Sequence, residues 1–291
     1  MRTHHITASI LSLANPWLDF LPPGSAPAAA RTLNNELSAI SAAHPGVLYA
    51  FAALPLTAPV ADVVAEVRRV KGLQGVKGVI MGTTGLGRGL DDEGMGPVWA
   101  ALEETGLLVF LHPHYGVPGE VYGPRAGEYG HVLPLAVGFP METTVAFARM
   151  YLGGVFERWA GLKVLLAHSG GAVPFLAGRI ESCVRHERTF RNKEGKEVQR
   201  RGIWEVLRGN VWLDAVVYSE VGLKAAVEAV GKERVLFGTD RPFFPPLDDE
   251  EGEGVWPSVR MNVDAVRGAF GDDEEAANMV LGGNAVELLK L

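Results

Sequence analysis

The sequence predicts an α/β protein, a TIM-like (β/α)8 barrel in which seven of the eight strands can be recognised. Two observations predict this fold. Short apolar runs alternate with helix-length segments along the whole chain, and few hairpin signals interrupt them. Three of the runs also end in His or Asp, as expected where catalytic groups follow parallel strands. The 291 residues suffice for a single barrel domain, 1–291, with C-terminal helices.

In the first half of the chain, apolar runs predict strands and 3.6-residue spacing predicts helices. The strands are expected at 6–13, 47–53, 76–81 and 107–112, and turn signals at Asn15-Pro16 and Leu54-Pro55 close the first two. The helices are expected at 31–43, 60–70 and 97–104. Residues 22–29 are rich in Pro, Gly and Ala and are expected to form a loop.

In the second half, the alternation resumes after a long loop that follows residue 112. Phe139-Pro140 starts a helix at 141–152, with Glu142 in its first turn, where a negative charge suits the helix dipole. Further helices are expected at 174–187 and 220–230, and further strands at 163–168, 210–214 and 234–239. The tail is expected to be helical, with a start at Asp272 and a break at Gly282-Gly283.

The composition of the chain bears on which partners it can bind and on the compartment in which it works. The net charge of −7 argues against nucleic acid as the main partner. No apolar run approaches the roughly 18 residues that a membrane span needs, so no membrane role is expected. The single cysteine, Cys183, excludes a disulfide within the chain, and no clear leader pattern precedes residue 14. These features predict a cytoplasmic protein.

An open doubly wound sheet is the alternative to a barrel. Such a sheet binds its ligand where the strand order reverses, often through a glycine-rich phosphate loop. Residues 82–89 contain four glycines, but without the Gly-x-Gly-x-x-Gly spacing at a helix start. We interpret them as a mobile loop over the barrel mouth.

His112, His168 and Asp240 each follow an apolar run and are expected to meet at one end of the barrel. Each alone has an ordinary explanation: a hydrogen-bonded histidine at the rim, or an aspartate that caps a helix or pairs with Arg241. Together, two imidazoles and one poorly solvated carboxylate predict a metal or acid/base site. No serine lies in a Gly-x-Ser-x-Gly pattern, which disfavours acyl-serine chemistry.

Several motifs carry a resemblance to a known family. They are Ala167-His-Ser-Gly-Gly171, Gly178-Arg-Ile-Glu181, Phe237-Gly-Thr-Asp-Arg-Pro-Phe243 and Gly283-Asn-Ala285. In these motifs the chain resembles the metal-dependent decarboxylase branch of the amidohydrolase superfamily, which includes α-amino-β-carboxymuconate-ε-semialdehyde decarboxylase and the resorcylate decarboxylases. Segments 12–19, 111–115 and 138–144 look most like those of 6-methylsalicylate decarboxylases.

The resemblance implies roles for the residues at the strand ends. His112 and Asp240 match ligands of a single divalent metal ion, for which zinc is expected and manganese is the alternative. Asp240 and His168 match the catalytic residues that handle protons. The implied reaction is the non-oxidative decarboxylation of a hydroxybenzoate-type aromatic acid such as 6-methylsalicylate.

The resemblance also implies how the substrate is held. Arg179 matches an arginine that reaches into the neighbouring subunit's site to hold the substrate carboxylate, so a homodimer is expected. His114 and Trp17 lie in the segments closest to the 6-methylsalicylate enzymes and are expected to contact the substrate. The expected partner is therefore a small aromatic carboxylic acid.

One departure from the family pattern concerns the first barrel strand. The family begins with His-x-His on that strand, whereas His4 and His5 are adjacent here and would point to opposite faces of a strand. The missing strand is therefore expected to be the first one, which supplies two further metal ligands in the family. Two alternatives follow: a metal-dependent hydrolase on the same barrel, and a catalytically impaired homologue.

Overall fold

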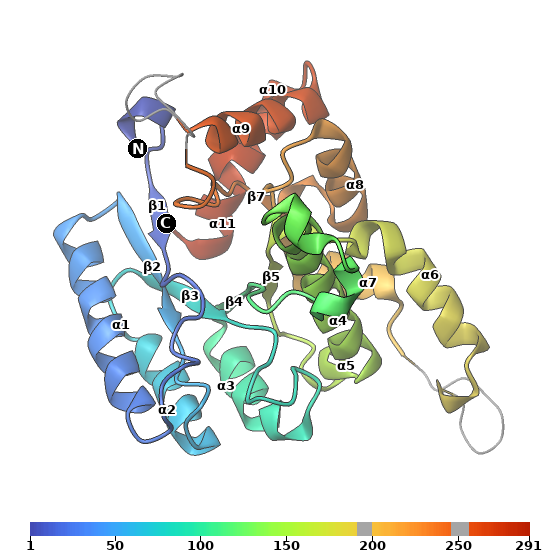
Figure 1. Cartoon of the computed structure of the whole chain (residues 1–291). Coiled ribbons are helices and arrows are strands. Elements are labelled where there is room, and N and C mark those ends of the chain that lie inside the picture. The colour runs from blue at the N-terminus through green and yellow to red at the C-terminus, as the bar shows by residue number, and fades with distance from the viewer. Residues whose placement is uncertain (191–199, 246–255) are drawn as a thin grey trace.

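The computed structural model describes residues 1–190, 200–245 and 256–291. Seven parallel strands stand in sequence order and curl into an open barrel whose outer face is covered by helices (Figure 1). The strands are β1 (Ser9–Leu11), β2 (Leu48–Ala53), β3 (Val76–Met81), β4 (Leu108–Leu111), β5 (Val164–Leu166), β6 (Val211–Asp214) and β7 (Val235–Leu236). The predicted fold class is confirmed. The strand order never reverses, so the doubly wound alternative is wrong.

The helices confirm most of the expected segments. They are α1 (Ala26–Ala43), α2 (Val60–Val70), α3 (Gly96–Thr105), α4 (Phe139–Leu152), α5 (Val155–Arg158), α6 (Val173–His186), α7 (Ile203–Asn210), α8 (Glu220–Val230), α9 (Pro257–Phe270), α10 (Glu274–Asn278) and α11 (Asn284–Leu289). The loop expected at 22–29 is wrong from Ala26 onward. Pro27 occupies the first helical turn, where its missing N–H costs nothing, and the alanines that follow favour helix. Helix α7 was not expected.

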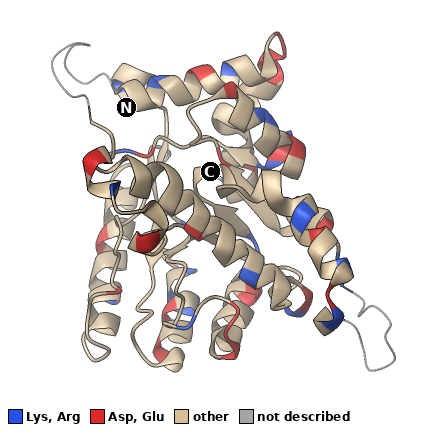
Figure 2. Ribbon diagram, turned by 45° about the vertical axis from the view of Figure 1, so that its right-hand side comes forward, with Lys and Arg blue, Asp and Glu red and all other residues tan. Residues whose placement is uncertain are grey.

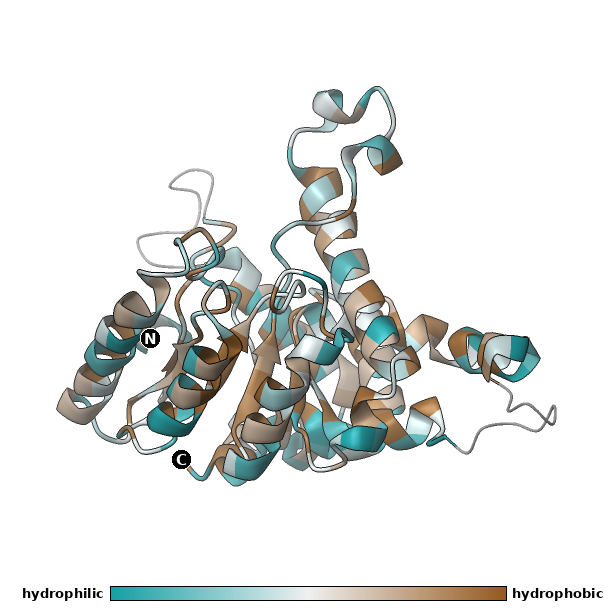
Figure 3. Cartoon of the chain, turned by 90° about the horizontal axis from the view of Figure 1, so that it is seen from below, coloured by the Kyte–Doolittle hydropathy of each residue, from teal (hydrophilic) through white to brown (hydrophobic). Residues whose placement is uncertain are grey.

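The strands are apolar on both faces because each face is buried. In β3, Val79 and Met81 pack against the outer helices, while Ile80 between them points into the barrel. The interior cluster takes one or more side chains from each of six strands: Phe51, Ile80, Leu108, Leu165, Trp212 and Leu236. Figure 3 shows the apolar strands lying between helices whose colours alternate along their length.

The two outermost strands are shorter than expected. The run at 6–13 forms a strand only over Ser9–Leu11, and the run at 234–239 only over Val235–Leu236. Each has a hydrogen-bonded neighbour on one side only among the described residues, so less of the run is held extended. Helix α11 packs beside β7, where Asn284 Nδ2 donates to the Val235 carbonyl at 2.8 Å. Its Leu289 is buried in the interior cluster, against which Ile10 of β1 also packs.

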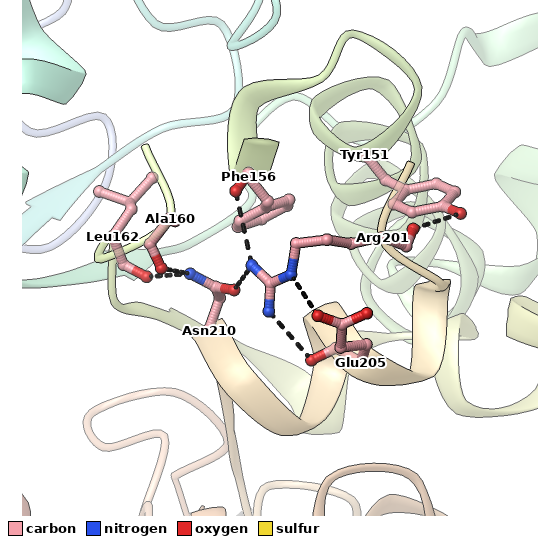
Figure 4. Close-up of polar contacts among 7 residues, drawn as sticks. All are labelled: Tyr151, Phe156, Ala160, Leu162, Arg201, Glu205 and Asn210. Atoms are coloured by element: carbon pink, nitrogen blue, oxygen red, sulfur yellow. Dashed lines mark hydrogen bonds and ion pairs between the residues drawn. The ribbon is translucent and has the colours of Figure 1, made fainter. Parts of the chain in front are cut away.

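A polar network anchors the segment that leads into β5 (Figure 4). At the end of α7, Asn210 Nδ2 donates to the carbonyls of Ala160 and Leu162, both at 2.8 Å. Arg201 in turn donates to Asn210 Oδ1 at 2.7 Å and to Glu205 Oε1 at 2.9 Å. Because β5 begins two residues after Leu162, this network holds the start of the strand in place.

Lys and Arg residues and Asp and Glu residues both occur along the outer helices (Figure 2). Of the helices in the described parts of the chain, none combines the length and apolar character that crossing a bilayer requires.

Candidate active site

The structure brings three predicted residues together beyond the carboxyl ends of β4, β5 and β7. His112 follows β4 directly, His168 lies two residues after β5, and Asp240 lies four residues after β7. One ligand atom of each lies within 4.8 Å of the other two. The two imidazole rings meet edge to face, with centroids 5.0 Å apart. All three residues line a cavity of about 770 Å³.

The tautomer of His112 follows from its contact with the backbone. Its Nδ1 lies 2.8 Å from the Pro113 carbonyl oxygen. A carbonyl only accepts hydrogen bonds, so Nδ1 carries the proton and donates it. The lone pair of His112 is therefore on Nε2, which is free to bind a cation.

Burial keeps both histidines neutral. It lowers the pKa of His112 to about 4, and together with the neighbouring His112 it lowers the pKa of His168 to about 3. Neutral imidazole is the form that coordinates metals. The Nδ1 atom of His168 is buried without a hydrogen-bond partner, which costs free energy unless something binds it.

Asp240 is held by a residue that sequence reasoning missed. The Tyr218 hydroxyl donates to Asp240 Oδ2 at 3.0 Å. Burial nevertheless raises the pKa of Asp240 to about 6, because its charged form is poorly solvated. No sequence signal marks Tyr218, which lies in the loop after β6 and 22 residues from its partner.

These observations test whether the residues present suit a divalent metal ion, and they do. Two neutral imidazoles, one of them with an unpartnered nitrogen, and one carboxylate form a donor set that zinc and manganese accept. A cation would also remove the cost of burying the Asp240 charge.

Trp17 and His114 lie beside this cluster. The Trp17 ring is 3% exposed and lies edge-on to His112 and His114, with centroids 6.2 and 6.1 Å apart. Trp17 lines the cavity, and its close packing depends on Gly82, whose missing Cβ would lie 2.6 Å from Trp17 Cζ3. The glycine-rich segment 82–89 does not lead directly into an α-helix, because α3 begins only at Gly96.

Glu142 fixes the loop that carries His114. Its carboxylate, 8% exposed in the first turn of α4, accepts hydrogen bonds from the Thr83 hydroxyl and from the backbone N–H groups of His114 and Gly116. Sequence reasoning assigned Glu142 only a favourable place in the helix dipole. Its buried contacts join the β3 and β4 loops, and no local pattern reveals that.

Arg179 does not join the cluster within this chain. It lies on an exposed part of α6 and does not line the cavity. Its predicted role depends on a second copy of the chain.

Several known proteins that the chain resembles are named as decarboxylases. A family model described as Amidohydrolase matches residues 14–291. The chain is 32% identical over 262 residues to 2-amino-3-carboxymuconate-6-semialdehyde decarboxylase of Dictyostelium discoideum, covering 90% of this chain and 66% of the relative. It is 28% identical over 249 residues to 6-methylsalicylic acid decarboxylase of Penicillium expansum, covering 84% of this chain and 73% of the relative.

Solved structures show the same fold. A crystal structure of Metarhizium anisopliae IDCase in apo form matches with a TM-score of 0.95 and 52% identity, covering 100% of this chain and 76% of that one. A dihydroxybenzoic acid decarboxylase from a Polaromonas species, with bound manganese and the inhibitor 2-nitroresorcinol, matches with a TM-score of 0.79 and 25% identity. That match covers 100% of this chain and 84% of the other.

Proposed function

The chain belongs to the amidohydrolase family, and from this premise we propose that it is a metal-dependent decarboxylase of hydroxybenzoate-type aromatic acids such as 6-methylsalicylate. The observation that carries the proposal is the cluster of His112, His168 and Asp240 in a cavity large enough for an aromatic acid. The decarboxylases that the chain resembles support the reaction type.

His112 and Asp240 would hold one divalent ion, with His168 beside them. When bound, such an ion supplies Lewis-acid polarisation of the carboxylate and hydroxyl oxygens of an aromatic acid. The bound manganese of the Polaromonas structure supports a single divalent ion. We propose zinc or manganese, and metal analysis of the purified protein distinguishes them.

The protein's own groups would handle the proton. Decarboxylation adds a proton to the ring carbon that bears the carboxylate. The bond to the carboxylate carbon then breaks, its electron pair returns to the ring, and CO₂ leaves. Asp240, held by the hydrogen bond from the Tyr218 hydroxyl, would deliver this proton to the ring. Neutral His168 would accept or relay a proton, and the edge of Trp17 would exclude water.

The test is product formation by the metal-loaded protein. Incubation with 6-methylsalicylate and Mn²⁺ or Zn²⁺ should release CO₂ and 3-methylphenol, and the variants His112→Ala and Asp240→Asn should lose at least about 100-fold in rate. His131→Ala, which changes an exposed histidine, is the matched control and should keep the rate. Ring opening of a lactone without CO₂ release would favour a hydrolase. Absence of stoichiometric metal and of any turnover on hydroxybenzoates would favour an impaired homologue.

We also propose a homodimer in which Arg179 binds the substrate carboxylate in the partner's site. Arg179 is exposed on α6, where Phe175 is 87% exposed, and Val145 on the adjoining α4 is 50% exposed. Large exposed apolar side chains of this kind mark contact surfaces. Light scattering should give twice the chain mass, and mixing Arg179→Ala with His112→Ala should restore part of the activity that each variant lacks alone.

The proposed compartment is the cytoplasm, because the single cysteine, Cys183, is an exposed free thiol that suits a reducing environment. Cell fractionation followed by immunodetection tests this.

A further inference from the structure

The turn that presents His168 has an unusual backbone. His168, Ser169, Gly170 and Gly171 all have positive φ, at 56°, 52°, 75° and 63°. Glycine adopts this left-handed conformation freely, but a residue with a Cβ does not. His168 and Ser169 therefore hold their conformation only because surrounding contacts impose it.

Asp214, the last residue of β6, makes those contacts. Its Oδ2 accepts a hydrogen bond from the His168 N–H at 3.1 Å, and its Oδ1 accepts one from the Ser169 N–H at 2.8 Å. The Ser169 hydroxyl donates to the Asp214 carbonyl at 2.8 Å. Asp214 Oδ1 also accepts from the Val216 N–H at 3.1 Å, which fixes the carboxylate itself.

Packing closes the remaining directions of movement. A Cβ on Gly170 would lie 2.8 Å from Leu213 Cδ2, so the turn lies directly against β6. A Cβ on Gly171 would overlap the Pro140 carbonyl at the start of α4. The turn is thus held between β6 and α4, and Asp214 supplies its polar attachment.

We propose that Asp214 is the positioning residue for His168: its carboxylate holds the strained turn after β5, and so directs the imidazole toward His112 and Asp240. Both carboxylate oxygens are engaged by backbone N–H groups, so Asp214 acts through the turn that carries His168. The catalytic consequence of this inference rests on the proposed function, but the positioning itself is a property of the metal-free protein.

The first test uses NMR on metal-free, ¹⁵N-labelled protein, in which both the backbone amides and the histidine ring nitrogens are observed. Asp214→Asn keeps the shape of the side chain but presents an N–H donor to part of the turn. We expect amide exchange at His168 and Ser169 to quicken at least about tenfold, because the amide has one acceptor oxygen where the carboxyl group uses two, and we expect the His168 ring signals to move. Amides of β3 are the internal reference and should not change. Unchanged His168 signals in the folded variant would overturn the proposal.

The second test is kinetic and separates positioning from a general structural role. Asp214→Asn should lower kcat at least about tenfold with little change in KM, whereas in a His168→Ala background the same substitution should change kcat less than about twofold. An equal loss in both backgrounds would show that Asp214 does not act through His168. If the protein turns over no hydroxybenzoate, the proposed function fails, while the exchange experiment still decides the positioning.

A third variant guards against misfolding of Asp214→Asn. Ser169→Ala removes only the bond from the Ser169 hydroxyl to the Asp214 carbonyl and leaves the three N–H bonds in place. It should produce a smaller change, about threefold in exchange, confined to the same two amides. Unchanged exchange there, or a change spread over the whole sheet, would contradict the proposal.

Discussion

Replacing Asp240 by asparagine is expected to stabilise the metal-free protein at neutral pH. Burial raises the pKa of Asp240 from 3.8 to about 6, so the folded state resists its ionisation more than the unfolded state does. The stability that this group contributes is complete below about pH 4 and is lost as pH rises through 6. Two pKa units correspond to about 3 kcal/mol. The asparagine oxygen can still accept the Tyr218 hydroxyl, so about 2 kcal/mol should be recovered after allowance for partial solvation.

Urea unfolding of chelator-treated protein between pH 5 and 8 measures this gain. The difference in unfolding free energy between variant and wild type should grow from pH 5 to about pH 7 and then level off, since the variant has no carboxyl group there. Titration of His112 and His168 affects the unfolding free energy of both proteins alike, so it largely cancels in the difference between them. Adding Mn²⁺ at 100 times its Kd should stabilise the wild type by about 2.7 kcal/mol and the variant much less. Equal stabilities at pH 8, or a gap independent of pH, would refute the reasoning.

Three further substitutions test the surroundings of the site. Glu142→Gln should cost about 1–3 kcal/mol in urea unfolding and raise KM, because the β4 loop loses charge-assisted hydrogen bonds; an unchanged KM would separate this loop from substrate binding. Gly82→Ala should displace Trp17 and quench or shift its fluorescence, whereas Gly24→Ala, with open space around it, should not. Asn210→Ala should cost about 1–3 kcal/mol in thermal unfolding, since two carbonyls lose their donor, and an unchanged Tm would contradict that.

The parts of the fold that depend on local sequence pattern could be predicted. His112, His168 and Asp240 each follow an apolar strand within four residues, and parallel pairing brings the exits of such strands to one edge. Strand order followed from the strand–helix alternation. The start of α1 did not, because a Pro/Ala segment such as 26–29 is compatible with loop and with a first helical turn.

The supporting residues of the site could not be predicted. Asp214, Tyr218 and Glu142 act through partners that are between 22 and 59 residues away. Their roles arise only when neighbouring strands and loops are in register, and an aspartate after an apolar strand or a glutamate in a first turn has common local explanations. The left-handed turn at His168 was similarly hidden, since His and Ser rarely adopt that conformation.

The spacing of the three central residues along the chain has a consequence for refolding. His112, His168 and Asp240 come from strands β4, β5 and β7, so they meet only after the sheet has formed across its later half. Contacts between residues so distant in sequence form slowly and late. Uptake of a cation during refolding would therefore report that the sheet has formed from β4 to β7, and it should lag behind the recovery of helical signal.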